Sequence, residues 1–354
     1  MSAAKTLVAR KVAVIGSGSW GTAVTGLLAP HVELVSLWSF EPEVVRQINA
    51  SRHNPHQLTK YEVDPCVCAT SSLSEATDDA DAILLVVPSA FLRGVCEQLV
   101  GCVDPTTPIL VLTKGVERTT GCLMVDVVAQ TLGFAERIAV LSGPNHAEEI
   151  SEGTISAAVV AAHDERIARY FQQMVVSTTF RAYVSDDVCG VEVCAAVKNV
   201  IALACGVASA MGAGDNTLAA LMTRGLAEMN RIAVSLGADP LTCMGLAGMG
   251  DLVVTCTSHH SRNRTFGEAY VAGESLAQYQ ARTGMVVEGA EAAASIHELA
   301  REKHVDAPIT NAVYQILYED CDLGDAMGML LGRHPRDEFY GVVPGARSGE
   351  EEEE

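Results

Sequence analysis

Six residues near the start of the chain have the spacing of a phosphate-binding loop. Gly16-Ser17-Gly18-Ser19-Trp20-Gly21 follows the apolar run 12–15 and precedes Thr22-Ala23-Val24. This order predicts a buried strand, a Gly-x-Gly-x-x-Gly turn and a helix. The first two glycines allow a tight turn and a close approach of the backbone to phosphate, and the third allows the helix to pack on the strand. Because the helix N-terminus also offers free N–H groups to an anion, the segment predicts a site for NAD, NADP or FAD.

The residues after the second expected strand, 33–38, indicate which dinucleotide is bound. An acidic residue at this place accepts hydrogen bonds from the ribose hydroxyls in NAD enzymes, whereas an arginine pairs with the extra phosphate of NADP. Glu41 lies slightly further along the chain than the residue that usually makes the ribose contact. The nearest arginine, Arg46, falls inside the next expected helix. The pattern favours NAD, and the use of both cofactors stays open.

Two polar positions follow other expected strands. Lys114 comes directly after the apolar strand 109–112, and Asn145 and His146 follow the strand 138–141. Ligands of open α/β sheets bind at the carboxyl ends of the strands, so these side chains are candidates for a site. The Asn145 amide can donate to a carbonyl. His146 is a candidate acid or base, although a histidine beside two glutamates is more often structural. For Lys114 the alternative interpretation is a solvated lysine on a surface loop.

Three further places combine charge with an apolar or glycine-rich setting. Lys198 lies in an alanine-rich expected helix, where a lysine is costly unless it is paired, functional or extended to the surface. Gly248-Met249-Gly250-Asp251 places a carboxylate where another backbone or a ligand can come close. Ser261-Arg262-Asn263-Arg264 offers two guanidinium groups at an expected helix start. The last pattern predicts a cradle for phosphate or carboxylate, with a solvated basic turn as the alternative.

In this order the motifs resemble those of NAD(P)-dependent glycerol-3-phosphate dehydrogenase, most closely the soluble bacterial type. Besides the glycine loop, the series includes Val-Pro-Ser-x-Phe at 87–91, Leu-Thr-Lys-Gly at 112–115, Ser-Gly-Pro-Asn-His-Ala-Glu-Glu at 142–149, Val-Lys-Asn-Val-Ile-Ala at 197–202, Gly-Met-Gly-Asp-Leu at 248–252 and Ser-Arg-Asn-Arg at 261–264. The resemblance extends over residues 11 to 333. Seven ordered motifs at compatible spacing make a chance match implausible.

The resemblance implies a role for each residue of these motifs. Lys198 would be the general acid and base, oriented by Asp251, while Lys114 and Asn145 would contact the reacting oxygen or the substrate backbone. The residues implied to bind the substrate are Lys114, Gly143, Asn145, Lys198, Asp251, Thr255, Ser261, Arg262 and Asn263. Those implied to bind the cofactor are Gly16, Gly18, Ser19, Trp20, Gly21, Phe40, Phe91, Lys114, Ala147, Arg262, Val286 and Glu288.

The chain departs from the family pattern in two places. Ser39-Phe40 stands where bacterial members often carry an arginine, which puts a preference for NADP in doubt. The polar segment 49–66 diverges, so no cofactor contact transfers to it. We interpret this segment as a surface loop, with a flap over the cofactor as the alternative.

The implied activity is the interconversion of dihydroxyacetone phosphate and sn-glycerol 3-phosphate by hydride transfer with NAD(P)H, supplying phospholipid synthesis in the cytoplasm. One alternative is another two-domain NAD(P)-dependent dehydrogenase acting on a hydroxy acid, but the Ser-Arg-Asn-Arg cradle favours a small phosphorylated substrate. Another is a non-catalytic NADH-binding sensor, which would have no use for Lys114, Asn145, Lys198 and Asp251 together. A homodimer stays open.

The pattern along the chain predicts how these residues are positioned. Short apolar runs alternate with helical spacing up to residue 187, which predicts a doubly wound, Rossmann-type parallel sheet in an N-terminal α/β domain, 1–187. Long helical periods then predict an all-helical C-terminal domain, 188–345, that binds the substrate. The glutamate-rich end, 346–354, is expected to be a disordered acidic tail.

Composition excludes several other classes of protein. The net charge of -20 argues against binding to nucleic acid or to an anionic membrane surface. The odd number of cysteines without a Cys-x-x-Cys pair indicates reduced thiols, and no apolar segment free of charge is long enough to span a bilayer. A zinc site from Cys256, His259 and His260 lacks a second ligand pair, so ordinary loop residues, and no metal, are the favoured interpretation.

Overall fold

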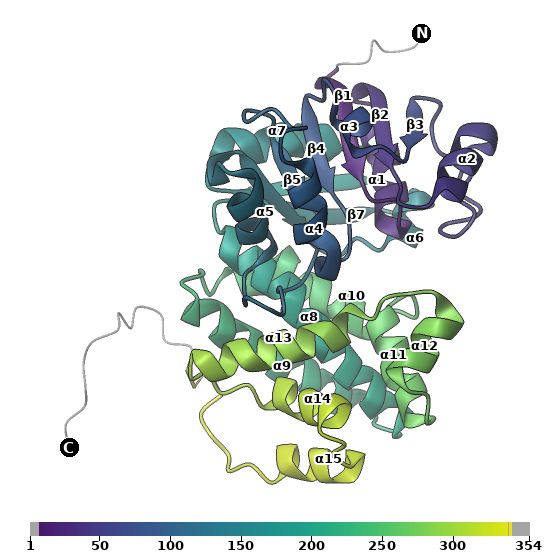
Figure 1. Ribbon diagram of the computed structural model, residues 1–354. Helices are drawn as coiled ribbons and strands as arrows, with labels where there is room; N and C mark the ends of the chain where they lie inside the picture. The colour runs from purple at the N-terminus through teal and green to yellow at the C-terminus, as the bar shows by residue number, and fades with distance from the viewer. Residues whose placement is uncertain (1–6, 339, 342–354) are drawn as a thin grey trace.

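One eight-stranded sheet forms the N-terminal half of the molecule. The structure, a computed structural model, describes residues 7–338, 340 and 341, so the acidic tail expected at 346–354 lies outside it (Figure 1). The strands run in the order β3-β2-β1-β4-β5-β6-β7-β8. Their bounds are β1 (Ala9–Ile15), β2 (Val32–Trp38), β3 (Val67–Thr70), β4 (Ala82–Leu85), β5 (Ile109–Val111), β6 (Ile138–Ser142), β7 (Ser156–Ala162) and β8 (Phe180–Ser185).

Helices cover both faces of this sheet. They are α1 (Ser19–Leu28), α2 (Pro42–Ser51), α3 (Leu73–Thr77), α4 (Ser89–Leu99), α5 (Met124–Leu132), α6 (Ala147–Ser151) and α7 (Glu165–Val175), with the short turn η1 (Ala135–Arg137). Successive residues of β1 point to opposite faces. Val12 and Val14 pack with α1 and α7, whereas Ala13 and Ile15 pack with α4, α5 and the first helix of the other half. The predicted Rossmann-type fold is therefore confirmed.

The sheet differs from the prediction at two places. We expected all strands to be parallel, but β7 pairs with β6 in the antiparallel direction. A parallel pair needs a crossover long enough to lead the chain back along the sheet, and α6, with five residues, is too short for that. In addition, β3 and α3 were not predicted, because their apolar runs are short.

The segment 49–66 is anchored more firmly than the interpretation as a surface loop implies. Asn54 is fully buried, and its Nδ2 donates to the Ser17 carbonyl at 2.8 Å and to Thr22 Oγ1 at 2.9 Å. The Ser19 hydroxyl in turn donates to Gln57 Oε1. The segment therefore supports the glycine loop from outside.

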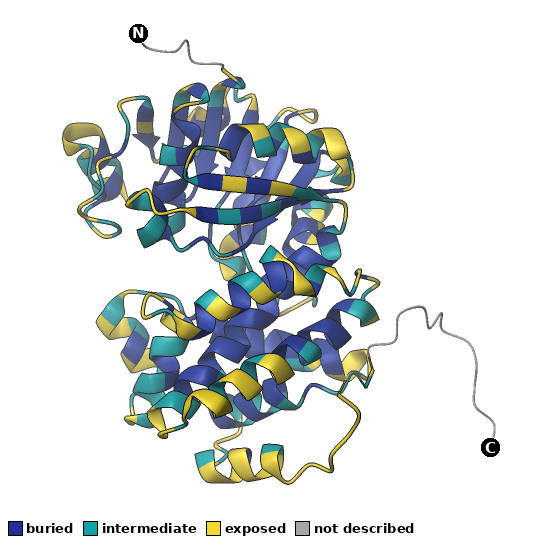
Figure 2. Ribbon diagram, turned by 180° about the vertical axis from the view of Figure 1, so that it is seen from behind, coloured by how far each residue is buried: buried dark blue, intermediate teal, exposed yellow. Residues whose placement is uncertain are grey.

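The second half of the molecule is helical and surrounds one central helix, α8 (Val188–Ala210). Around it lie α9 (Asp215–Ser235), η2 (Thr242–Met244), η3 (Leu246–Gly250), α10 (Asp251–Thr257), α11 (Arg262–Val271), α12 (Leu276–Thr283), α13 (Glu288–Glu302), α14 (Pro308–Tyr318) and α15 (Leu323–Leu331). Among the described residues α8 alone is long and apolar enough to cross a membrane, but 89% of its apolar window is buried inside the structure. Figure 2 shows this interior in dark blue.

Helix α8 also joins the two halves. Glu192 on α8 is buried and accepts a hydrogen bond from the Val125 N–H, in the first turn of α5, at 2.8 Å. Burial raises the pKa of Glu192 to about 8, and the backbone hydrogen bonds oppose this rise. The proposed division at residues 187 and 188 falls between β8 and α8, in a junction that is packed rather than a free linker.

Candidate active site

A cavity of about 930 Å³ lies where the two halves meet. The sheet half contributes the glycine loop and the residues after β4, β5 and β6. The helical half contributes Lys198 of α8, Asp251 of α10 and the first turn of α11. As predicted for an α/β sheet, the polar groups gather at the carboxyl ends of the parallel strands.

The glycine loop fits a dinucleotide pyrophosphate. Gly16 has a φ of +123°, and a Cβ placed on it would lie 2.7 Å from the Val86 carbonyl oxygen. A Cβ on Gly21 would lie 1.9 Å from the Gly16 oxygen, so packing requires glycine at both positions. Nothing lies within 4 Å of a Cβ on Gly18, the N-cap residue just before α1, which provides no side-chain cap. The open space and the free N–H groups of α1 are therefore available to phosphate.

The outer end of the cavity carries exposed aromatic side chains. Phe40 and Phe91 are 83% and 60% exposed although both line the cavity. Between them and the loop, the buried Ser39 hydroxyl accepts hydrogen bonds from Ser17 Oγ at 2.7 Å and from the Glu41 N–H at 3.2 Å. Arg46 pairs with a glutamate on its own helix and does not line the cavity.

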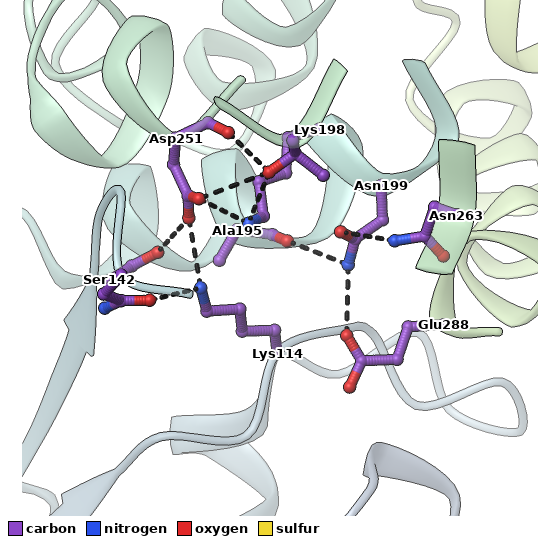
Figure 3. A network of polar contacts seen from close by, with 10 residues as sticks. Lys114, Ser142, Ala195, Lys198, Asn199, Asp251, Asn263 and Glu288 are labelled. Carbon is purple, nitrogen blue, oxygen red and sulfur yellow. Dashed lines mark hydrogen bonds and ion pairs between the residues drawn. The ribbon is translucent and has the colours of Figure 1, made fainter. Parts of the chain in front are cut away.

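At the inner end one carboxylate is shared by two lysines (Figure 3). Asp251 Oδ1 lies 2.6 Å from Lys198 Nζ, and Asp251 Oδ2 lies 3.1 Å from Lys114 Nζ. Ser142 Oγ, at the end of β6, donates to the same Oδ2 at 3.3 Å, and Lys198 also donates to Thr255 Oγ1 at 3.1 Å. Asp251 is 2% exposed and Lys198 is 4% exposed, so these charges meet in a setting of low polarity.

The surroundings change the ionisation of both partners. Burial lowers the pKa of Lys198 to about 8; Asp251 opposes this shift and the positive charge of Lys114 adds to it. Burial on its own would raise the pKa of Asp251, but Lys114 and Lys198 outweigh it and lower that pKa. The site therefore holds an ionised carboxylate beside a lysine that can release its proton near neutral pH.

The amide nitrogen of Asn145 has no hydrogen-bond partner among the described residues. Lys114 Nζ lies 3.3 Å from Asn145 Oδ1, and because an ammonium group only donates, this contact fixes the orientation of the amide. Asn145 Nδ2 is buried and makes no hydrogen bond within the described residues. A buried donor of this kind is normally satisfied, so it is available to a ligand oxygen.

The first turn of α11 forms a second polar region. Ser261 caps the helix by accepting from the Arg264 N–H, and the Arg264 side chain bonds the Thr257 carbonyl and Glu268. The Arg262 side chain lines the cavity and has no partner among the described residues. Of the two arginines in this motif, only Arg262 is therefore free to bind an anion.

Known proteins share this arrangement over most of their length. A family model described as the N-terminus of NAD-dependent glycerol-3-phosphate dehydrogenase matches residues 11–168, and the model of the C-terminus matches residues 187–328. The chain belongs to this family. As a member of the NAD-dependent glycerol-3-phosphate dehydrogenases it is an NAD(P)-dependent oxidoreductase, so the alternative of a non-catalytic sensor is set aside.

Individual members of the family agree with this assignment. The chain is 46% identical to a glycerol-3-phosphate dehydrogenase [NAD(P)+] of Thermobifida fusca, over 94% of this chain and 99% of the relative. It is 42% identical to the glycerol-3-phosphate dehydrogenase [NAD(P)+] of Latilactobacillus sakei, over 93% of this chain and 98% of the relative. The crystal structure of glycerol-3-phosphate dehydrogenase from Coxiella burnetii superposes with a TM-score of 0.88 at 36% identity, covering 92% of this chain and all of that one.

The structure of this glycerol-3-phosphate dehydrogenase family member brings nearly all the predicted site residues to one cavity. Gly143 is the exception: it does not line the cavity. Its φ is +149°, and a Cβ on it would lie 2.7 Å from the Ala158 Cα, so it shapes the turn after β6. The predicted residues that line the cavity are Gly16, Gly18, Ser19, Trp20, Gly21, Phe40, Phe91, Lys114, Asn145, Ala147, Lys198, Asp251, Thr255, Ser261, Arg262, Asn263, Val286 and Glu288.

Two contributors to the site were given no role by the sequence. Ser142 bonds Asp251 although the two are 109 positions apart, so no local pattern indicates the contact. Asn199 accepts from Asn263 Nδ2 at 2.9 Å and donates to Glu288 at 3.3 Å, which connects the two implied binding regions. Its place beside Lys198 in an apolar helix could have indicated it.

The zinc alternative has no support in the geometry. His259 and His260 line the cavity. No group of three or more histidine, cysteine, aspartate or glutamate side chains within residues 7–338, 340 and 341 is placed to hold a metal ion.

A π-helical turn, η3, places Asp251 at the start of α10. A Cβ on Gly248 would lie 2.0 Å from the Cys243 carbonyl oxygen, whereas one on Gly250 would make only ordinary contacts, the nearest at 3.5 Å. We expect Gly248→Ala to displace the turn and lower kcat by about tenfold or more, because small misplacements of catalytic groups have large effects. Steady-state kinetics on the matched variant Gly250→Ala should give nearly unchanged kcat. Equal kcat in the two variants would show that the turn does not position Asp251.

Proposed function

We propose that this oxidoreductase interconverts dihydroxyacetone phosphate and sn-glycerol 3-phosphate with NAD(P)H. The observation that supports this most strongly is the pair of ammonium groups, Lys198 and Lys114, on one buried carboxylate, Asp251. This cluster shares a cavity with a dinucleotide loop and with the unpaired guanidinium of Arg262. A small phosphorylated ketone, bound together with a dinucleotide, matches the three regions: the cluster can bind its carbonyl, Arg262 its phosphate and the loop the dinucleotide.

Each polar group has a task in this reaction. The nicotinamide of the bound cofactor supplies the hydride that reduces the ketone carbon. Asn145 Nδ2 donates to the carbonyl oxygen, and the charge of Lys114 stabilises the negative charge that develops there. Lys198 then gives its proton from Nζ to that oxygen. After Lys198 has lost its proton, the ammonium group of Lys114 still pairs with the Asp251 carboxylate, so no buried negative charge is left unpaired.

The Lys198 pKa of about 8 predicts opposite pH dependences for the two directions. Ketone reduction needs the ammonium form, so kcat/KM should be constant below about pH 8 and fall about tenfold per pH unit above it. Oxidation of glycerol 3-phosphate needs the free amine and should rise with pH up to the same point. Because the charge of Lys114 lowers this pKa, Lys114→Met should move both breaks to higher pH. An unchanged break in that variant would contradict the electrostatic role.

We also propose that NADH is preferred over NADPH. The support is local: Ser39, Phe40 and Glu41 follow β2, and among the described residues that line the cavity the one arginine is Arg262, which comes from α11 in the other half. Glu41, whose carboxylate lies 3.4 Å from His56 Nε2, would repel a 2′-phosphate. The proposed setting is a cytoplasmic enzyme that supplies glycerol 3-phosphate to phospholipid synthesis.

One experiment tests both the reaction and the cofactor. Absorbance at the nicotinamide band is followed with dihydroxyacetone phosphate and with NADH or NADPH in parallel. We expect rapid oxidation with a higher kcat/KM for NADH. If neither cofactor is oxidised, the proposed reaction is wrong; if NADPH has the higher kcat/KM, only the preference is wrong.

A further inference from the structure

His146 is a cavity residue to which the mechanism above gives no task. It follows Asn145 directly, precedes the short helix α6 and forms part of the cavity wall. Its Nε2 is buried and has no hydrogen-bond partner among the described residues. Native proteins satisfy such atoms with protein, water or ligand, so this nitrogen is available to a bound substrate.

The position of the ring indicates which part of the substrate that is. The His146 and His260 rings lie 6.4 Å apart, centre to centre, with their planes tilted by 54°. His260 immediately precedes Ser261 and Arg262, where the phosphate of the substrate is proposed to bind. The His146 ring, which comes from the sheet half, therefore lies beside His260, the residue just before the cap of α11 in the helical half.

The charges around His146 favour a neutral ring. It faces Lys198 from α8, Asp251 from α10, Lys114 from the turn after β5 and Glu148 from α6. Burial lowers the pKa of His146 below the ordinary value, and the positive charge of Lys198 is the second cause of this shift. A neutral imidazole keeps one N–H, which is a donor suited to an anionic oxygen. A phosphate has several terminal oxygens and can accept more hydrogen bonds than Arg262 and Ser261 donate.

We propose that His146 is a substrate-binding residue that donates from Nε2 to a phosphate oxygen. This rests on the proposed function, and it adds that the phosphate is held from both halves of the molecule. His146 thereby contributes to the preference for a phosphorylated ketone over a plain one.

The test compares two substitutions on two substrates. His146→Phe keeps the ring shape but has no nitrogen, whereas His146→Gln keeps an amide nitrogen near the place of Nε2. Each is assayed with NADH on dihydroxyacetone phosphate and on unphosphorylated dihydroxyacetone. We expect His146→Phe to lower kcat/KM for the phosphorylated ketone about 10- to 100-fold, the usual size for a hydrogen bond to a charged group, and to leave the other ketone unaffected. His146→Gln should recover most of the loss.

Binding of inorganic phosphate, measured by calorimetry, gives a readout that is independent of turnover. Its dissociation constant should rise in His146→Phe and recover in His146→Gln, and the control His259→Phe, an exposed ring on the same cavity, should leave it unchanged. Equal losses with both ketones would place His146 at the carbonyl and overturn the proposal, as would no loss with either. If the unsubstituted enzyme does not oxidise NADH with dihydroxyacetone phosphate, the proposed function itself fails, whatever the phosphate titration shows.

Discussion

Lys198→Ala is expected to reduce kcat for ketone reduction by about 10²- to 10⁴-fold, the range measured for the loss of a general acid. Lys198 is the buried ammonium group in contact with Asp251 Oδ1, at 2.6 Å, and its lowered pKa suits a proton donor near neutrality. NADH affinity should stay nearly the same, because the glycine loop and the aromatic residues at the outer end do not depend on this side chain. Lys114 still balances Asp251, which limits the loss of stability.

Single-turnover reduction and NADH fluorescence titration measure these two effects separately. The control is Lys303→Ala, which removes an exposed lysine whose one ion pair among the described residues is with its neighbour Glu302, and which should behave as the unsubstituted enzyme. A Lys198→Ala enzyme that kept most of its kcat would remove Lys198 from the role of acid.

The second large effect is expected for Arg262→Ala, which should raise KM for dihydroxyacetone phosphate by about 10- to 100-fold. Its guanidinium has no partner among the described residues and lines the cavity at the start of α11, so a phosphate dianion would be its counter-charge. The effect on kcat should be smaller, because the carbonyl is held by other groups. KM is obtained from initial rates at saturating NADH.

Arg264→Ala provides the matched control for that substitution. Arg264 lies two residues further on, but its side chain is held by the Thr257 carbonyl and Glu268 and is not part of the cavity wall. KM should change little, although the melting temperature should fall because a helix contact is lost. If both arginine variants raised KM equally, the cause would be damage to α11 and not the loss of a phosphate contact.

The sequence was sufficient where the structure is determined by local spacing. The β1–loop–α1 unit was predicted because strand, turn and helix follow one another within twenty residues, each with its own pattern. The same holds for the start of α8. Long-range pairing carries no such pattern: the antiparallel β6–β7 pair goes with the short helix α6 between the two strands, and β3 depends on pairing with β2.

The candidate site shows the same limit. Asp251 and Lys198 were singled out because a charge between glycines, or in an apolar helix, needs an explanation. Their contact and the approach of Ser142 are tertiary, and neither could be derived from spacing without the family resemblance. Asn54 shows the limit more clearly, since nothing in the polar segment 49–66 indicates that this asparagine is fully buried and bonds the glycine loop.

Helix α8 bears on how this protein could be recombined with its relatives. It presents Lys198 to the cavity and inserts Glu192 under the first turn of α5, while Asp251 bonds Lys114 in the turn after β5 and Ser142 at the end of β6. A chimaera that joined the sheet half of one dehydrogenase to the helical half of another would bury the carboxylates of Glu192 and Asp251 against residues from a different sequence. The two halves therefore act as a matched pair, and an exchange has to carry the first turn of α5, the turn after β5 and the end of β6 along with the helical half.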